Sequence, residues 1–232
     1  MGGGAGGRAL TRLTSPAADD ARDALLVVPV GATEQHGPHL PLSTDTDLAV
    51  ALAERLACVN ARVVIAPAVA YGSSGEHQAF AGTLSIGSDA TELLLVELGR
   101  SATETWERVL YVSTHGGNAV PVARAVDRLR AEGRDVRRWS PRWSGDAHAG
   151  LSETSLMLTL DAERVARDRI ADAVGAREPI GELMAALRRD GVAAVSPNGV
   201  LGDATGASAE HGAALMNAAV DDLVDSVRSW TA

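Results

Sequence analysis

The sequence predicts an α/β fold with three layers, in which a mostly parallel sheet has helices on both faces. Short apolar runs typical of buried strands alternate along the chain with longer segments of helical periodicity. A polar loop follows each predicted strand and leads towards the next helix. Repeated strand–loop–helix units of this kind form parallel sheets covered by helices, with right-handed crossovers.

Each element can be placed along the chain from its pattern. The expected strands are Leu25–Val30, Arg62–Val69, Arg108–Ser113 and a stretch around Val136–Trp139. Helices are expected at about Asp47–Cys58, Asp89–Trp106, Val122–Ala131, Glu182–Arg189 and Ala209–Trp230, with a short one that opens at Ser152. We expect Ser88 to cap the second helix and Gly133 to close the third.

The chain length of 232 residues is common for one domain with a sizeable core. We expect a flexible, glycine-rich leader at residues 1–24 and a single domain at residues 25–232. The leader lacks the apolar segment of a secretory signal, and no apolar run approaches the roughly 20 residues that span a bilayer. We therefore expect no membrane segment.

The cysteine content limits which kinds of covalent cross-link and metal site the chain can form. Cys58 is the only cysteine, which excludes an intramolecular disulfide and a cysteine-based zinc cluster. It ends an apolar helical stretch, so we expect a buried structural thiol rather than a nucleophile. These features predict a protein of the reducing cytoplasm.

The charge pattern excludes further classes of function. A formal net charge of −9 argues against a general affinity for nucleic acid or anionic membranes. The sequence contains no lysine, which excludes Schiff-base chemistry, a phosphate-loop lysine and a Ser–Lys dyad. Any chemistry must come from the six histidines, the carboxylates or a hydroxyl.

Four histidine-bearing motifs share one predicted location. The sequences EQHG, GEHQ, THGGN and DAHAG each lie after a predicted strand. Loops that follow the strands of a parallel sheet converge at its carboxyl edge, where ligands bind. The sequence therefore predicts a functional site at this edge.

The residues in these loops are of the types that bind divalent metal ions. Glu34 and His36 are two residues apart, so in extended backbone their side chains point to the same side, and Asp45 follows on the same loop. His115 adds an imidazole from another strand end, and Glu153 adds a carboxylate at the start of a helix. Carboxylates and imidazoles together suit Zn²⁺, Mn²⁺ and Fe²⁺ alike.

Each residue taken alone also has a structural interpretation. A single loop histidine is more often a satisfied polar residue than a ligand, and Glu153 could serve only the start of its helix. We expect Asp47 to favour the helix dipole, and His39 and His211 to be structural. Trp143, like Trp139, could be core or could wall a substrate pocket.

Several of these segments resemble a known family in order and spacing. PVGATEQHGPHLPLSTDTD, YGSSGEHQAFAGT, HGGN and DAHAGLSETS are similar to the motifs of the creatininase family. The resemblance implies an α/β amidohydrolase with two divalent ions per subunit, assembled as a homo-oligomer. It implies that Glu34, Asp45 and His115 hold one ion, that His36 and a further carboxylate hold the other with Asp45 between them, and that His148 lines the substrate pocket.

The sequence departs from creatininase at one place. Creatininase has a glutamate two residues after the histidine that matches His115, with an aromatic residue between them, whereas this chain has Gly117 and Gly116. Our hypothesis is that Glu153 supplies the missing ligand. The missing aromatic residue leaves a more open pocket, which counts against creatinine as the substrate.

A narrower subgroup of the family resembles the whole chain, including GEHQAFAGTLSIG and GVAAVSPNGVLGD. Its members act on a ribosomally made precursor peptide whose C-terminal Val-Tyr pair has been decarboxylated and cross-linked, and they release that modified dipeptide. The resemblance thus implies a peptide substrate. It carries no implication of nucleic acid or membrane as a partner.

The expected mechanism has no covalent intermediate. A metal-activated water attacks the amide carbonyl, and His148 or a metal-site carboxylate such as Glu153 accepts its proton. Glu76 and His77 are candidates for positioning the substrate, and Gly116 would let it approach closely.

The same residues are also compatible with other functions. A deformylase-like hydrolase of a small formamide would use the same metals, and a metal-binding protein without catalysis would share the ligands. A structural metal site is normally closed by cysteine or histidine, which disfavours the second alternative. A serine hydrolase has little support, because GSSG does not match G-x-S-x-G.

Overall fold

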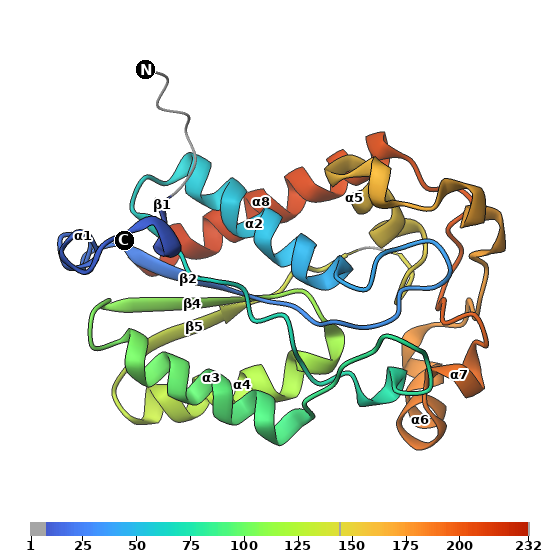
Figure 1. Cartoon of the computed structure of the whole chain (residues 1–232), viewed down its shortest axis with the longest axis horizontal. Coiled ribbons are helices and arrows are strands. Elements are labelled where there is room, and N and C mark those ends of the chain that lie inside the picture. The colour runs from blue at the N-terminus through green and yellow to red at the C-terminus, as the bar shows by residue number, and fades with distance from the viewer. Residues whose placement is uncertain (1–7, 144, 232) are drawn as a thin grey trace.

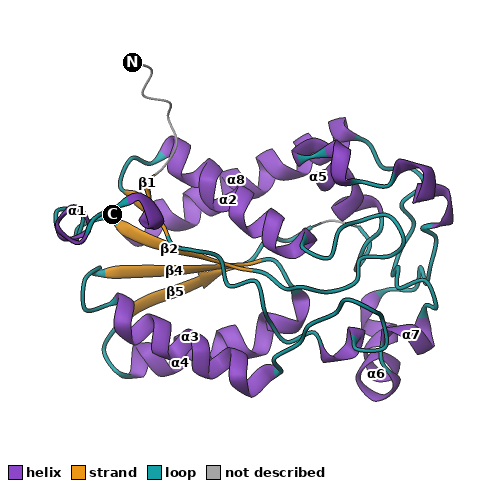
Figure 2. Ribbon diagram, in the orientation of Figure 1, coloured by secondary structure: helices purple, strands orange, loops and turns teal. Residues whose placement is uncertain are grey.

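The computed structural model describes residues 8–143 and 145–231. Within this part of the chain, the strands form one parallel sheet in the order β1-β3-β2-β4-β5 (Figure 2). The strands are β1 (Arg8–Ala9), β2 (Leu25–Val30), β3 (Val63–Ile65), β4 (Arg108–Ser113) and β5 (Asp135–Trp139). The predicted α/β class with a parallel sheet is confirmed.

Helices cover both faces of the sheet and give it three layers (Figure 1). One face carries α2 (Thr44–Val59), α5 (Leu151–Leu160) and α8 (Ala209–Thr231), and the other carries α3 (Ser88–Ala102) and α4 (Ala119–Ala131). Successive residues of a strand point to opposite faces. Accordingly Val27 packs in the core beneath α2 and α8, whereas Leu26 and Val28 pack in the core beneath α3 and α4.

Three shorter helices lie outside these layers. They are α1 (Ser15–Asp19), α6 (Ile180–Asp190) and α7 (Val192–Val195). Figure 1 shows α6 and α7 beyond the carboxyl ends of the strands, on the side where the polar loops gather. No helix of the described residues combines the length and the apolar character that crossing a bilayer requires.

The predicted elements agree with the structure except at their ends. Gly133 closes α4 as predicted, with φ of 81° and its N–H donating to Arg130. Ser88 is the first residue of α3 rather than its cap, because Gly87 takes that position with φ of 78°. The second strand is shorter than predicted, since Pro67 has no N–H to continue the ladder.

Two other predictions were wrong. The expected leader was too long, because β1 pairs with β3 and Ala21 and Ala24 are buried against the sheet; residues 1–7 lie outside the described part. Cys58 is exposed, not buried. It lies one helical turn after the exposed Glu54 and therefore shares the solvent face of α2.

A glycine lets α8 lie directly against α5, the helix that carries Glu153. A Cβ atom at Gly212 would lie 1.9 Å from the carbonyl oxygen of Ser155 and 2.4 Å from Oγ1 of Thr159. A Cβ atom at Gly181, in α6, would meet no atom within 4 Å. The two helical glycines therefore differ in what a methyl group would contact.

We expect Gly212→Ala to lower the free energy of unfolding by about 1–3 kcal/mol or more, because the added methyl group overlaps backbone atoms. Gly181→Ala is the matched control, and it should leave the free energy unchanged or raise it by up to about 1 kcal/mol through helix propensity. Urea denaturation measures both variants. Equal effects of the two substitutions would contradict the packing described for α5 and α8.

Candidate metal centre

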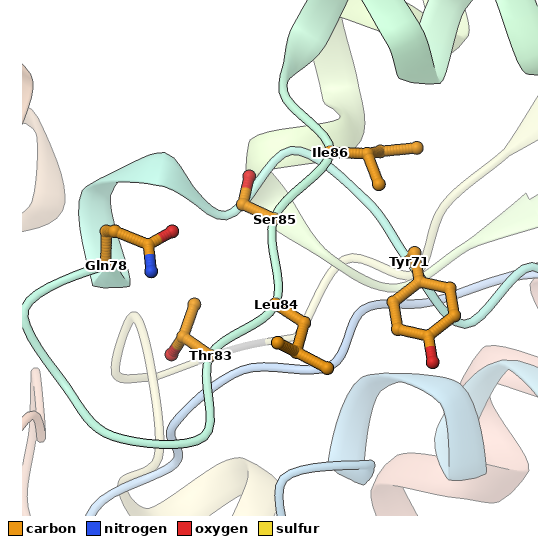
Figure 3. Close-up of a pocket in the computed structure, with 6 residues that line it drawn as sticks. All are labelled: Tyr71, Gln78, Thr83, Leu84, Ser85 and Ile86. Atoms are coloured by element: carbon orange, nitrogen blue, oxygen red, sulfur yellow. The ribbon is translucent and has the colours of Figure 1, made fainter.

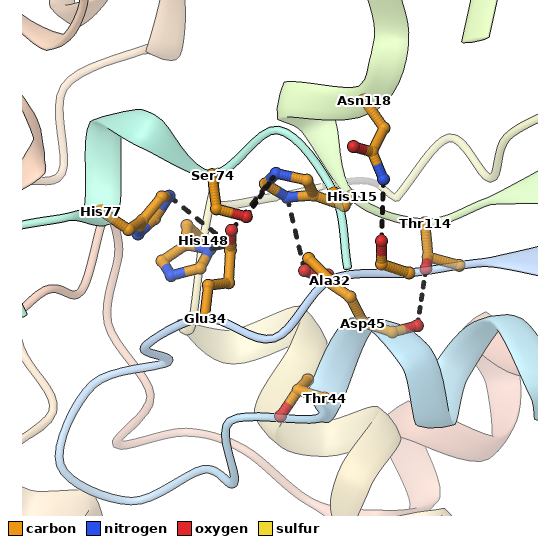
Figure 4. Close-up of polar contacts among 12 residues, drawn as sticks. Ala32, Glu34, Thr44, Asp45, Ser74, His77, Thr114, His115, Asn118 and His148 are labelled. Carbon is orange, nitrogen blue, oxygen red and sulfur yellow. Dashed lines mark hydrogen bonds and ion pairs between the residues drawn. The ribbon is translucent and has the colours of Figure 1, made fainter. Parts of the chain in front are cut away.

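The four predicted loops converge at the carboxyl edge of the sheet (Figure 4). Glu34 and His36 follow β2, His77 ends a short 3-10 helix after β3, His115 follows β4, and His148 lies between β5 and α5. All five side chains are buried. The structure thus brings the four histidine-bearing motifs together at this edge.

Backbone contacts bring the loops together. Gly31 directly follows β2 and lies against the start of α2. A Cβ atom on Gly31 would lie 2.4 Å from Cα of Thr46. Oγ1 of Thr114, just after β4, donates to the carbonyl oxygen of Asp45 at 2.7 Å.

The side chain of Asn118 links further loops. Its Nδ2 donates to the carbonyl oxygen of Gly31 at 2.8 Å, and its Oδ1 accepts from the Ser73 N–H at 2.9 Å. Asn118, the last residue of the HGGN motif, therefore joins the loops that follow β2, β3 and β4.

The first group of possible ligands contains Glu34, Asp45 and His115. Nε2 of His115 lies 3.2 Å from Oε2 of Glu34, and its Nδ1 lies 3.4 Å from Oδ2 of Asp45. The structure thus brings together the three residues that the resemblance assigned to one ion.

The second group contains His36, His148 and Glu153. Nε2 of His36 lies 3.8 Å from Oε2 of Glu153 and 3.6 Å from Oδ1 of Asp45, while Nδ1 of His148 lies 3.9 Å from Oε2 of Glu153. The two oxygens of Asp45 therefore face different groups, as a bridging carboxylate requires. Glu153 also accepts the Ala149 N–H at 2.6 Å, so it serves the start of α5 as well.

Hydrogen bonds fix which nitrogen of each imidazole carries its hydrogen. Nδ1 of His36 donates to the carbonyl oxygen of Glu34 at 3.1 Å, and Nε2 of His148 donates to that of Gln35 at 2.9 Å. Nε2 of His115 likewise donates to the Ser73 carbonyl oxygen at 2.9 Å. The second nitrogen of each ring therefore faces carboxylate oxygens, and a positive charge is needed between them.

The buried polar atoms of the site support the same conclusion. Both carboxylate oxygens of Glu34, Nε2 of His36 and Oδ2 of Asp45 have no hydrogen-bond partner among the described residues. Within that part of the chain, the ion pairs of Glu34, Asp45 and Glu153 involve only histidines. Burying a charged carboxylate without a hydrogen bond or a permanent positive charge beside it costs free energy.

The pKa values of Glu34 and His36 are both raised, which means that both residues bind a proton more tightly than usual. Burial raises the pKa of Glu34 to about 7, although the nearby His115 opposes the shift. Burial lowers the pKa of His36, but Asp45 and Glu153 outweigh it and raise the pKa to about 10. The site thus attracts protons, and a divalent cation would satisfy the same atoms. These imidazole and carboxylate donors fit Zn²⁺, Mn²⁺ or Fe²⁺.

Gln35 is a residue of the site that the sequence did not reveal. Its Oε1 accepts the Gly37 N–H at 2.8 Å, which fixes the orientation of the amide. Its Nε2 donates to the Gly199 carbonyl oxygen at 3.0 Å and to Nδ1 of His77 at 2.8 Å. His77 must therefore carry its hydrogen on Nε2, which lies 3.5 Å from Oε1 of Glu34. Glu34, His77 and His148 also form a third group of possible ligands. With its hydrogen on Nε2, however, His77 is a donor to Glu34 or to a substrate.

A cavity of about 1030 Å³ opens onto the metal centre. Glu76, His77 and Gly116, which were expected to bind substrate, line it together with His148. Trp143, the other expected substrate-binding residue, packs against the core beneath α2 and α8 and is not among the described residues that line this cavity. The aromatic pocket wall considered from the sequence is therefore absent from this cavity as the structure describes it.

Three residues expected to be structural have structural contacts. Asp47 lies in the first turn of α2 and accepts from Ser43 at 2.8 Å. Nε2 of the buried His39 lies 2.7 Å from Oγ1 of Thr154. His211 lies in the first turn of α8, where its backbone N–H donates to Oγ of Ser208 at 3.1 Å.

We expect Gln35→Glu to weaken metal binding by about 10–100-fold, because a carboxylate cannot donate to His77 and Gly199. Competition with a chromophoric chelator measures the affinity. The ¹⁵N resonances of the imidazoles should show the hydrogen of His77 on Nε2 in the natural protein and a different protonation pattern in the variant. Gln78→Glu, at an exposed glutamine, is the control. Unchanged resonances and affinity in Gln35→Glu would contradict the role given to this amide.

Comparisons with known proteins agree with this geometry. The sequence model of the family described as "Creatininase: Creatinine amidohydrolase" matches residues 11–227. A "Mycofactocin precursor peptide peptidase" of Mycobacterium ulcerans is 49% identical over 216 residues, which cover 89% of this chain and 85% of that protein.

Solved structures extend the similarity to the fold. The structure titled "Creatininase Mn" has a TM-score of 0.82 and 26% identity, covering 96% of this chain and 98% of the other. A mutant creatininase described as "Zn-Zn type" has a TM-score of 0.81 and 26% identity, covering 95% and 97%. The resemblance found in the sequence motifs is thereby confirmed, and the chain belongs to the creatininase family of amidohydrolases.

Proposed function

We propose that this chain is a metal-dependent peptidase that releases the modified, Val-Tyr-derived dipeptide from the C-terminus of the mycofactocin precursor peptide. The observation that carries the proposal is the 49% identity to a mycofactocin precursor peptide peptidase over most of both chains. The paired ligand groups at the carboxyl edge of the sheet support hydrolysis of an amide bond there.

We propose two divalent ions per subunit. Glu34, Asp45 and His115 would hold one, and His36 and Glu153 would hold the other, with Asp45 shared. When bound, such ions supply a Lewis acid that polarises a carbonyl group and lowers the pKa of water.

Gly117 explains why Glu153 is assigned to the second ion. A Cβ atom at position 117 would lie 2.1 Å from the carbonyl oxygen of Ser73 and 2.5 Å from Nε2 of His115. No side chain fits there without displacing the Ser73 backbone. A glutamate at this position, as creatininase has, is therefore sterically disfavoured. Glu153 brings a carboxylate to His36 from α5 instead.

His148 and His77, which this proposal does not count as metal ligands, have separate roles. His148 presents Nδ1 to Glu34 and Glu153, because its Nε2 donates to the Gln35 carbonyl oxygen. It would accept the proton of the attacking water at Nδ1 and deliver it to the leaving nitrogen. Nε2–H of His77, with Glu76 beside it at the cavity wall, would position the substrate.

The size of the cavity favours a peptide over a small amide. At about 1030 Å³ it lies at the upper end of the roughly 300–1,000 Å³ range of sites for drug-sized ligands. Creatinine or a formamide would leave most of this space empty. Hydrolysis of a small amide or formamide is therefore the second candidate.

A homo-oligomer remains a prediction. A second, smaller hollow of about 400 Å³ lies beside the loop after β3, and Figure 3 shows its apolar residues Tyr71, Leu84 and Ile86. Tyr71 is 50% exposed and Leu84 is 54% exposed. No lining residue of this hollow is a carboxylate or a histidine, so an interface role suits it better than a chemical one.

The test is mass spectrometry of the cross-linked precursor peptide after incubation with the purified, metal-loaded protein. We expect the peptide to lose the mass of the modified dipeptide. Treatment with a chelator should abolish this loss, and added metal should restore it. Glu34→Gln should remove both activity and bound metal, because it takes a buried carboxylate away from the ligand group with Asp45 and His115.

An intact peptide under metal-replete conditions would contradict the peptidase proposal, and small formamides would then be the next substrates to assay. Chelator-resistant cleavage would contradict the metal-dependent mechanism.

A further inference from the structure

The cavity extends beyond the metal centre to a wall made by two helices. On α4 its lining includes Val120 and Arg124, and on α6 it includes Ile180, Met184 and Arg188. Residues four apart lie on the same helical face, one turn after another. Each helix therefore presents apolar side chains to the cavity, with an arginine one turn further along.

The arginines of this wall differ in how far they are neutralised within the described part of the chain. Arg189 also lines the cavity, but it is paired with Asp190 at 2.7 Å. Arg124 is 59% exposed at its side chain and reaches Glu92 only at 3.8 Å. The guanidinium group of Arg188 has no ion pair or hydrogen bond among the described residues. Among the described residues, Arg188 thus brings an unpaired positive charge to a cavity whose lining also holds Glu76 and Asp190, and Arg124 adds a second charge that is paired only at long range.

The apolar residues of this wall are unusually exposed. Val120 is 54% exposed and Ile180 is 45% exposed, and Met184 lies one turn after Ile180 on α6. An apolar surface rimmed by charged groups, continuous with a metal centre, is typical of a ligand-binding groove. The wall therefore offers a ligand both apolar contact and charge complementarity.

We propose that this wall, defined by Val120, Arg124, Ile180, Met184 and Arg188, binds the peptide substrate on the amino side of the cleaved bond. The inference rests on the proposed function. The released fragment is only a dipeptide, so the rest of the substrate must leave the metal centre through the cavity. The wall selects a stretch that carries carboxylate side chains for Arg124 and Arg188 and apolar side chains for the residues between them.

The experiment uses synthetic peptides that end in the modified dipeptide and differ only upstream of the cut. One carries alternating Glu and Leu, the second Gln and Leu, and the third Lys and Leu. With the metal-loaded natural protein, we expect kcat/KM for the Glu peptide to exceed that for the Gln peptide at least tenfold. The difference should come from a lower KM for the Glu peptide, with kcat unchanged.

Arg188→Glu should remove this preference and favour the Lys peptide instead. Arg130→Glu makes the same charge change on the exposed surface of α4, away from the cavity lining, and should keep the preference for the Glu peptide. This reversal is a result that a general loss of folding could not produce.

A parallel binding measurement separates this inference from the proposed function. The fluorescence anisotropy of the labelled upstream Glu segment, which has no bond to be cleaved, reports binding alone. Cleavage of all three peptides with equal KM would overturn the inference and leave the peptidase intact. Arg188-dependent binding without any cleavage would support the groove and contradict the peptidase.

Discussion

Negative charge buried at one end of a parallel sheet is the constraint on which the site depends. Glu34, Asp45 and Glu153 are buried together, and among the described residues their ion pairs are with histidines only. Backbone carbonyl oxygens accept a hydrogen from one nitrogen of His36, His115 and His148, and the other nitrogen of each ring faces the carboxylates. Buried carboxylates are stable only beside positive charge, which protons or bound metal ions can supply. The geometry of these loops therefore suits the binding of cations.

The fold supplies this arrangement through its topology and a few backbone contacts. Parallel strands deliver their following loops to one edge, and α2 begins close enough to β2 for Asp45 to face both ligand groups. Asn118 joins the loops that follow β2, β3 and β4, and Gln35 joins the first of these loops to Gly199 far along the chain. These neutral amides hold the charged residues in place without adding charge of their own.

The sequence predicted the fold class and most of the site because both follow from local patterns. Glu34, His36 and His115 could be found because each follows an apolar strand, whose carboxyl end has a predictable place. The role of Gln35 could not be found, since its partners His77 and Gly199 lie 42 and 164 residues away. The position of Trp143 in the chain likewise gave no sign of whether it faced the core or the cavity, and in the structure it packs against the core.

The central claim, that two ions share Asp45 and that Glu153 replaces the family glutamate, can be tested by diffraction. Crystals of the manganese-loaded protein would be measured at a wavelength where manganese scatters anomalously. We expect two anomalous peaks, one in contact with Glu34, Asp45 and His115 and the other with His36, Asp45 and Glu153. A single peak, or a second peak that Glu153 does not touch, would contradict it.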